Sequence, residues 1–158
     1  NGTVVHGRNM DYNVTFPGPD GRMRDLADVT YEVTWLRSGQ PIMVSVQFLP
    51  MIGITTGMRI GGWSFQQNTR PGSSDVASTL AAARRGAEGY ELLARRVMEQ
   101  VPDFASAVDA LYAANLMAPQ YFILAGAGPY EGAVITIDRE GQHLRGTPPV
   151  QRLGRRPG

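Results

Sequence analysis

The sequence predicts an α+β fold, because segments with strand character come first, helical segments follow, and strands return near the end. Segments rich in β-branched and aromatic residues occupy 29–68, helical periodicity occupies 76–114, and two short apolar segments lie within 121–138. The chain has 158 residues, of which 42% are hydrophobic, and this is enough for one globular domain with a substantial core. We therefore expect sheet packed against sheet, with helices outside.

The first element is a short run with strand character, Thr3–His6, which follows Asn1 and Gly2. Asn-Gly ahead of a β-branched run is a strong hairpin signal, because both central residues of a type I′ turn need a positive φ. A hairpin has two strands, so we expect a further strand ahead of Asn1. We interpret the sequence as a fragment, or a processed piece, of a longer protein.

A loop and two paired strands come next. The segment 13–24 is rich in proline and glycine, which predicts the loop. Val29–Leu36 and Ile42–Leu49 predict the strands, and the side chains of the second alternate in a way that is typical of a sheet buried mainly on one side. Gly53 and Gly57 then frame a segment that either lets backbone approach a substrate closely or forms an ordinary glycine turn.

Helices occupy the middle of the sequence, after a further predicted strand at Trp63–Asn68. The predicted helices span 76–85, 90–101 and 104–114. Ser74 or Asp75 can cap the first helix, and Asp103 can cap the third. Apolar residues recur at helical spacing in the second and third helices, so one face of each belongs in the core. The last predicted strands span 121–125 and 133–138.

Composition excludes several classes of function. The sequence has no Cys and only two His, so it offers no disulfide, no thiol nucleophile and no metal-ligand spacing. All 15 basic residues are Arg, and a net charge of +1 is not the footprint of a polyanion-binding protein. No apolar run is long enough to cross a bilayer. We expect no cofactor, no metal, no nucleic-acid partner and no integral membrane span.

The last segment, 145–158, differs from the rest in composition. It carries four Arg and no acidic residue, and it is rich in proline and glycine without apolar periodicity. Such a composition predicts a disordered basic tail, to which we assign no function. The preceding residues, 1–144, form the predicted domain.

Arg8 and Asp11 are the first candidate site residues, three positions apart just after the first predicted strand. An Asp beside an N-terminal nucleophile can accept a hydrogen bond from the α-amine of that nucleophilic residue. An Arg nearby holds the Asp ionised. The same spacing also suits a structural ion pair that closes a turn. The pair alone leaves both interpretations open.

Four segments, in this order and spacing, resemble the N-acylethanolamine acid amidase and acid ceramidase family of N-terminal-nucleophile hydrolases. They are H-G-R-N-M-D-Y over 6–12, G-I-T-T-G-M over 53–58, A-P-Q-Y-F-I-L-A-G over 118–126 and E-G-A-V-I-T-I-D-R over 131–139. The resemblance spans about 2–139. It implies a four-layer αββα fold with two antiparallel sheets and helices outside, incomplete at both ends, and it makes 1–144 a truncated amidase-like domain.

The resemblance also implies an activity, the hydrolysis of a linear amide in an N-acyl lipid such as an N-acylethanolamine or a ceramide-like compound. In the family the nucleophile is a Cys exposed by self-cleavage, and it opens the strand ahead of the expected hairpin. The chain as given is therefore predicted to be inactive alone. Its implied partners are an N-acyl amide substrate and a missing N-terminal strand or pro-segment. The sequence leaves the location unknown, and the resemblance is compatible with a soluble protein that is exported or lysosome-like.

The resemblance assigns catalytic roles to Arg8, Asp11, Asn68 and Thr69. Asn68 either donates an N–H to an oxyanion or is simply a polar strand end. Thr69 stands where the acid ceramidase branch has Glu, and it cannot supply a carboxylate. These residues leave an alternative open, a catalytically inactive family member that binds a lipid or a protein.

Further residues are candidates for the oxyanion and the acyl chain. Ala127 stands where acid ceramidase has an Asn donor, so only the backbone N–H groups of Gly126 and Ala127 remain as oxyanion donors. Five apolar residues are expected to contact substrate. They are Met10, Ile52, Ile54, Met58 and Trp63.

Overall fold

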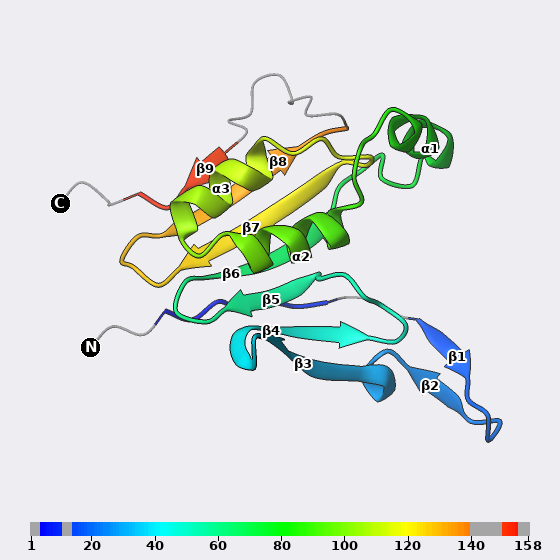
Figure 1. Ribbon diagram of the computed structural model, residues 1–158. Helices are drawn as coiled ribbons and strands as arrows, with labels where there is room; N and C mark the ends of the chain where they lie inside the picture. The colour runs from blue at the N-terminus through cyan, green and yellow to red at the C-terminus, as the bar shows by residue number, and fades with distance from the viewer. Residues whose placement is uncertain (1–3, 11–13, 140–149, 155–158) are drawn as a thin grey trace.

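The fold is built around one seven-stranded antiparallel sheet, in a computed structural model that describes residues 4–10, 14–139 and 150–154 (Figure 1). Its strands are β3 (Thr30–Arg37), β4 (Gln40–Phe48), β5 (Thr56–Arg59), β6 (Trp63–Thr69), β7 (Gln120–Gly126), β8 (Gly132–Ile137) and β9 (Val150–Arg152). They neighbour one another in the order in which they occur in the sequence. A second, two-stranded sheet pairs β1 (Thr15–Pro17) with β2 (Met23–Asp25), and the short 3-10 helix η1 (Ala27–Val29) leads from it into β3.

Three helices lie between β6 and β7: α1 (Val76–Arg84), α2 (Tyr90–Gln100) and α3 (Phe104–Tyr112). Figure 1 shows α2 and α3 across one face of the large sheet and α1 beyond one end of the strands. The predicted α+β class, with two antiparallel sheets and helices packed outside, is confirmed. No helix among the described residues is long and apolar enough to cross a membrane.

The hydrophobic core lies between the large sheet and the two helices α2 and α3. Its largest fully buried side chains come from both layers: Met43, Ile54, Trp63, Phe65, Leu93, Met98, Leu111, Leu116, Phe122, Leu124, Ile135 and Ile137. The rings of Phe65 and Phe122 meet at 5.4 Å between centroids. Burying one such side chain contributes about 1.5–3 kcal/mol, so this layer holds the sheet in place.

Carboxylate caps begin two of the helices. The side chain of Asp75 accepts a hydrogen bond from the backbone N–H of Ser78, and Asp103 does the same for Ser106. These hydrogen bonds lower the pKa of both carboxyl groups. The predicted cap at Asp103 is confirmed, and of the two candidates for α1 the cap is Asp75.

The buried side of β4 is the more polar one. Met43, Ser45 and Gln47 face the helices and are buried, whereas the other face of β4 carries the more exposed Val44 and Val46. The polar pair is satisfied, since Ser45 Oγ accepts a 2.8 Å hydrogen bond from the indole of Trp35 and Gln47 donates to Gly53 O at 2.8 Å. A sheet buried mainly on one side is therefore present, and an apolar surface remains on its other face.

Four predictions about the elements differ from the structure. The segment 13–24, predicted as a loop, contains β1 and the start of its partner strand β2. β5 was not predicted, and it begins at Thr56, inside the segment framed by Gly53 and Gly57, and ends at Arg59. Residues 4–6, predicted as part of a strand, join no strand among the described residues. In the predicted disordered tail, Val150–Arg152 instead form β9 and pair with β8, and the tail residues 145–149 and 155–158 lie outside the described ranges.

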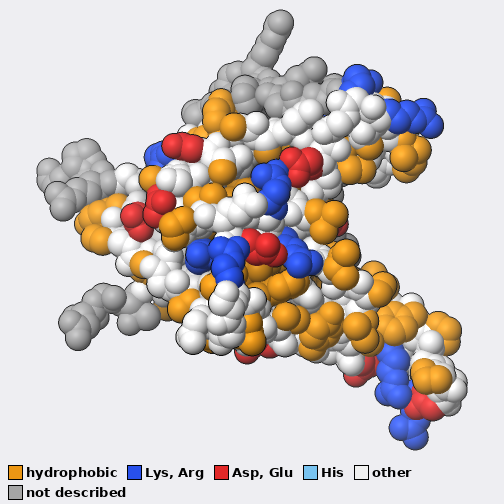
Figure 2. Space-filling model, in the orientation of Figure 1, with side chains coloured by type: hydrophobic (Ala, Val, Ile, Leu, Met, Phe, Trp, Pro, Cys, Tyr) orange, Lys and Arg blue, Asp and Glu red, His pale blue; other side chains and the backbone are white. Residues whose placement is uncertain are grey.

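The helix-bearing surface has mixed charge. On α2, Arg95 pairs with Glu99 at 2.8 Å and Arg96 pairs with Glu88 at 2.7 Å. Figure 2 shows acidic and basic side chains interspersed over this face. Partly exposed pairs of this kind contribute about 0–1 kcal/mol each, so this face is best understood as a solvated surface.

Candidate functional site

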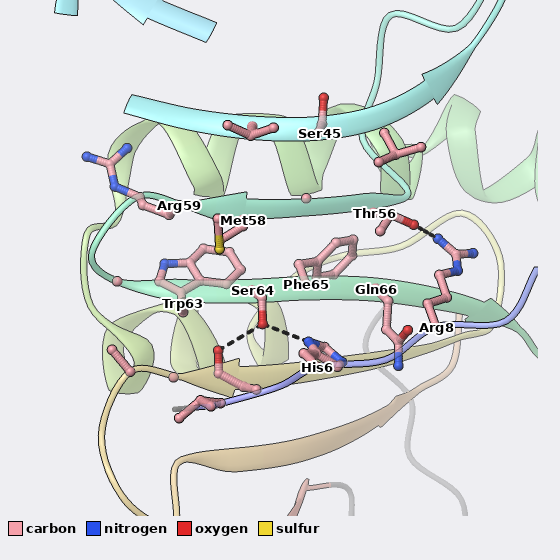
Figure 3. A pocket seen from close by; sticks show the side chains of 18 of the residues that line it. His6, Arg8, Ser45, Thr56, Met58, Arg59, Trp63, Ser64, Phe65 and Gln66 are labelled. Carbon is pink, nitrogen blue, oxygen red and sulfur yellow. Dashed lines mark hydrogen bonds between the residues drawn. The ribbon is translucent and has the colours of Figure 1, made fainter. Parts of the chain in front are cut away.

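The candidate site lies on the sheet face opposite α2 and α3, where residues 4–10 cross the strands (Figure 3). Arg8 fixes this segment. Its guanidinium donates to Thr55 O at 2.7 Å, to Gln67 O at 2.8 Å, and to the hydroxyl of Thr56. Because a planar guanidinium directs several N–H groups at fixed angles, one side chain here contacts both the start of β5 and the neighbouring strand β6.

His6 makes a second attachment two residues earlier. Its Nδ1 lies 2.7 Å from Ser64 Oγ on β6, and the Ser64 hydroxyl also lies 3.2 Å from the carbonyl oxygen of Ala125 on β7 (Figure 3). Burial lowers the pKa of His6, because a charged imidazolium loses solvation there. His6 thereby attaches the first segment to β6 through the side chain of Ser64, which in turn contacts β7.

A cavity of about 440 Å³ lies beside these two attachments. Its walls are mostly apolar, with a polar strip formed by the first segment, β5 and β6 (Figure 3). The lining residues are Val4, His6, Arg8, Val44, Ser45, Val46, Thr56, Gly57, Met58, Arg59, Gly61, Gly62, Trp63, Ser64, Phe65, Gln66, Ala125, Gly126 and Ala127. We call it the first cavity.

A second cavity of about 540 Å³ lies on the other side of Arg8, under η1 and the end of β2. The lining residues are Arg8, Met10, Val14, Asp25, Leu26, Ala27, Thr30, Val46 and Thr56. Three of these, Arg8, Val46 and Thr56, also line the first cavity. Arg8 therefore lies where two largely apolar spaces adjoin.

The predicted catalytic residues are not all brought together. Arg8 lines both cavities, whereas Asn68 and Thr69 are exposed at the end of β6 and line neither cavity. Asp11 lies outside the described residues. The pairing of Arg8 with Asp11 therefore stays a prediction, as do the roles of Asn68 and Thr69.

The predicted oxyanion donors line the first cavity, but their N–H groups already have acceptors. Gly126 N donates to Glu131 O at 2.8 Å, and Ala127 N donates to Gly62 O at 3.1 Å. The side chain of Glu131 also packs tightly against Gly126, since a Cβ there would lie 2.2 Å from a carboxylate oxygen. An oxyanion role for this turn would require one of these hydrogen bonds to be exchanged.

The predicted substrate-contacting residues are divided between three environments. Met58 and Trp63 line the first cavity, and Met10 lines the second. Ile54 is fully buried in the core, and Ile52 is 66% exposed, so neither lines a cavity. Among the described residues, no group of three or more His, Cys, Asp or Glu side chains could hold a metal ion.

No protein-family model matches the chain. Individual proteins with similar sequences are found, and they carry two names. The chain is 31% identical to N-acylethanolamine-hydrolyzing acid amidase of Rattus norvegicus over 140 residues, which cover 89% of this chain and 36% of the relative. The Caenorhabditis elegans enzyme of that name is 30% identical, with 87% of this chain and 37% of the relative covered. Acid ceramidase of Mus musculus is 27% identical over 148 residues, with 88% and 37% covered.

A solved structure agrees with these relatives. The Caenorhabditis elegans N-acylethanolamine-hydrolyzing acid amidase ortholog superimposes with a TM-score of 0.66 at 24% identity, covering 80% of this chain and 59% of that one. The chain spans just over a third of the length of the curated relatives it matches. The chain is thus similar in sequence to N-acylethanolamine-hydrolyzing acid amidases and acid ceramidases, and it shares its α+β fold with the Caenorhabditis elegans ortholog.

Proposed function

We propose that this protein hydrolyses the linear amide bond of an N-acyl lipid, such as an N-acylethanolamine or a ceramide-like compound. The observation that carries the proposal is the position of Arg8, anchored to β5 and β6 where two apolar cavities adjoin. An N-acyl lipid has a polar amide between an acyl chain and a head group. A fixed cation between two apolar spaces matches that distribution of polarity.

The nucleophile in this proposal is a Cys thiol supplied by sequence ahead of Asn1, since none of the 158 residues is Cys. The thiolate sulfur attacks the amide carbonyl, and the C–N bond breaks as the leaving nitrogen takes a proton. A thioester forms, and water then cleaves it to release the fatty acid and restore the thiol. The α-amine of that Cys serves as the base, because its unperturbed pKa of about 8 is near the pH at which a general base must work.

Arg8 and Asp11 orient the nucleophile in this proposal. A two-residue turn at Asn1 and Gly2 would fold an upstream strand back along 4–10, which would bring its first residue beside Asp11. Asp11 would accept a hydrogen bond from the α-amine of the nucleophile. Arg8, held by the carbonyl oxygen of Thr55 just ahead of β5 and by that of Gln67 on β6, would keep Asp11 ionised.

The test compares hydrolysis of a fluorogenic N-acyl amide by three proteins: the 158-residue chain, a longer protein that starts at the upstream Cys, and that longer protein with Asp11→Asn. We expect turnover only from the unsubstituted longer protein, with a loss of at least about a hundredfold in the Asp11 variant. Asp20→Asn is a matched control, because Asp20 pairs with Arg24 on an exposed hairpin. Equal turnover by the 158-residue chain would contradict the assigned nucleophile.

A second candidate is a binding module that has lost its chemistry. The exposure of Asn68 and Thr69 and the engaged N–H groups of Gly126 and Ala127 favour it. If the longer protein bound fatty acyl amides without hydrolysing them, this second function would replace the first.

A further inference from the structure

Several hydrogen-bond donors that line the first cavity already have acceptors within the protein. Backbone carbonyl oxygens accept from four of them: Gly126 N, Ala127 N, Trp63 Nε1 and the guanidinium of Arg59. The tetrahedral intermediate of amide hydrolysis carries a negative charge on oxygen and is stabilised by donors aimed at that oxygen. We therefore searched the cavity for a donor whose hydrogen is not already used.

Thr56 meets this requirement, because its hydroxyl serves as an acceptor. Nη1 of Arg8 donates to Thr56 Oγ1, and the same nitrogen donates to Thr55 O at 2.7 Å. The hydrogen of the Thr56 hydroxyl has no acceptor among the residues that the structure describes. A hydroxyl that accepts from a cation is also a stronger donor, because successive hydrogen bonds polarise one another.

The position of Thr56 brings this hydroxyl to the junction of the two cavities. Thr56 lines both of them, as Arg8 does, and Figure 3 shows the two side chains joined by their hydrogen bond. The residue opposite Thr56 on β4 is the apolar Val46, which also lines both cavities. A ligand that extends from one cavity into the other therefore passes the Thr56 hydroxyl.

We propose that Thr56 is a further catalytic residue, whose hydroxyl donates a hydrogen bond to the oxyanion of the tetrahedral intermediate. The inference rests on the proposed function. When the thiolate sulfur bonds to the amide carbon, the π electron pair of the carbonyl moves onto oxygen, and Thr56 stabilises this charge while keeping its own proton. The electron pair returns to the carbonyl as the C–N bond breaks and the thioester forms.

The test measures kcat and KM of the longer protein, which starts at the upstream Cys, with a fluorogenic N-acyl amide. Thr56→Val replaces the hydroxyl with a methyl group of similar size, and Thr56→Ser keeps the hydroxyl. We expect Thr56→Val to lower kcat about a hundredfold with little change in KM, because the lost hydrogen bond forms mainly in the transition state. Thr56→Ser should retain most of the activity.

Thr34→Val is the matched control for the loss of a hydroxyl. Thr34 lies opposite Val44 on the same face of the sheet, and it lines neither cavity. Its substitution should leave kcat and KM unchanged. If Thr56→Val does not fold, Thr56→Ala removes the same hydroxyl without added bulk, and its comparison with Thr56→Ser gives the same test.

A pH profile separates a direct role of Thr56 from one exerted through Arg8. If Thr56 only positioned Arg8, its loss would weaken the stabilisation of ionised Asp11 and move the acid limb of kcat/KM to higher pH. The carbonyl oxygens of Thr55 and Gln67 still hold Arg8 in Thr56→Val. We therefore expect this variant to keep the acid limb of the unsubstituted protein.

The possible results separate the two proposals. Undiminished kcat in Thr56→Val, or an equal loss in Thr56→Ser, would overturn the role of Thr56 and leave amide hydrolysis standing. A shifted acid limb in Thr56→Val would also overturn it, because the residue would then act through Arg8. No turnover by the unsubstituted longer protein would overturn amide hydrolysis and this inference together.

Discussion

At the scale of single residues, His6 couples the candidate site to pH. The imidazole is half-buried, and desolvation lowers its pKa below the ordinary value of 6.5. The charged groups that share its cavity are Arg8 from its own segment and Arg59 from β5, and no carboxylate among the described residues lines that cavity. Its environment therefore favours the neutral ring.

Because the pKa of His6 is lower in the folded protein, we expect the free energy of unfolding to depend on pH. A His whose pKa is lower in the folded state contributes stability that is fully present above 6.5 and is lost as the pH falls through the folded-state pKa. We expect the free energy of unfolding from urea titrations to fall between pH 7.5 and 5 more steeply for the unsubstituted chain than for His6→Asn. Parallel profiles for the two proteins would contradict the assigned burial of His6.

At the scale of elements, Arg8 joins the first segment to two strands. A Lys in its place keeps the charge but cannot reach Thr55 O, Gln67 O and the Thr56 hydroxyl together. We expect Arg8→Lys to lower the free energy of unfolding by about 1–3 kcal/mol, because buried acceptors lose their donor. Urea denaturation measures this effect.

The control for Arg8→Lys is Arg24→Lys. Arg24 makes an exposed ion pair with Asp20, and such pairs contribute about 0–1 kcal/mol. Its substitution should change the free energy of unfolding by less than about 0.5 kcal/mol. An equal effect of the two substitutions would show that the hydrogen bonds of Arg8 add nothing to stability.

Elements that carry their own signal could be predicted from the sequence. The strands β3, β4, β6, β7 and β8 have β-branched and aromatic runs, and the helices α1 and α3 begin at recognisable carboxylate caps. These local patterns predict the elements correctly because the tertiary structure favours the same local conformations.

Elements whose formation depends on a neighbour could not be predicted. β5 is short and contains Gly57, so its composition indicates a loop until β4 and β6 are present on either side. β9 lies in a proline- and glycine-rich tail and exists through its pairing with β8. Conversely, residues 4–6 have strand composition without joining a ladder.

The candidate site shows the same division. Arg8 was identified through a local motif, which the sequence displays directly. The contact of His6 with Ser64 joins residues 58 positions apart. Their importance follows from which strand faces the cavity, and this is set by sheet register rather than by composition.

At the scale of the whole molecule, the two faces of the large sheet have different roles. One face packs against α2 and α3 and forms the core. The other carries residues 4–10 and both cavities, so the apolar side chains left uncovered on β4 and β5 become cavity wall. The proposed chemistry depends on this second face, because the core side is closed by packing.

The most direct test of the central claim is the mass of the covalent intermediate. The longer protein, which starts at the upstream Cys, would be mixed with an N-dodecanoyl amide and quenched in acid within its first turnovers. Intact-mass and peptide measurements should then locate one dodecanoyl group on the N-terminal Cys, because a thioester must form before water releases the fatty acid. Hydrolysis without any acylated Cys, or a dodecanoyl group on Ser64 instead, would contradict the proposed mechanism.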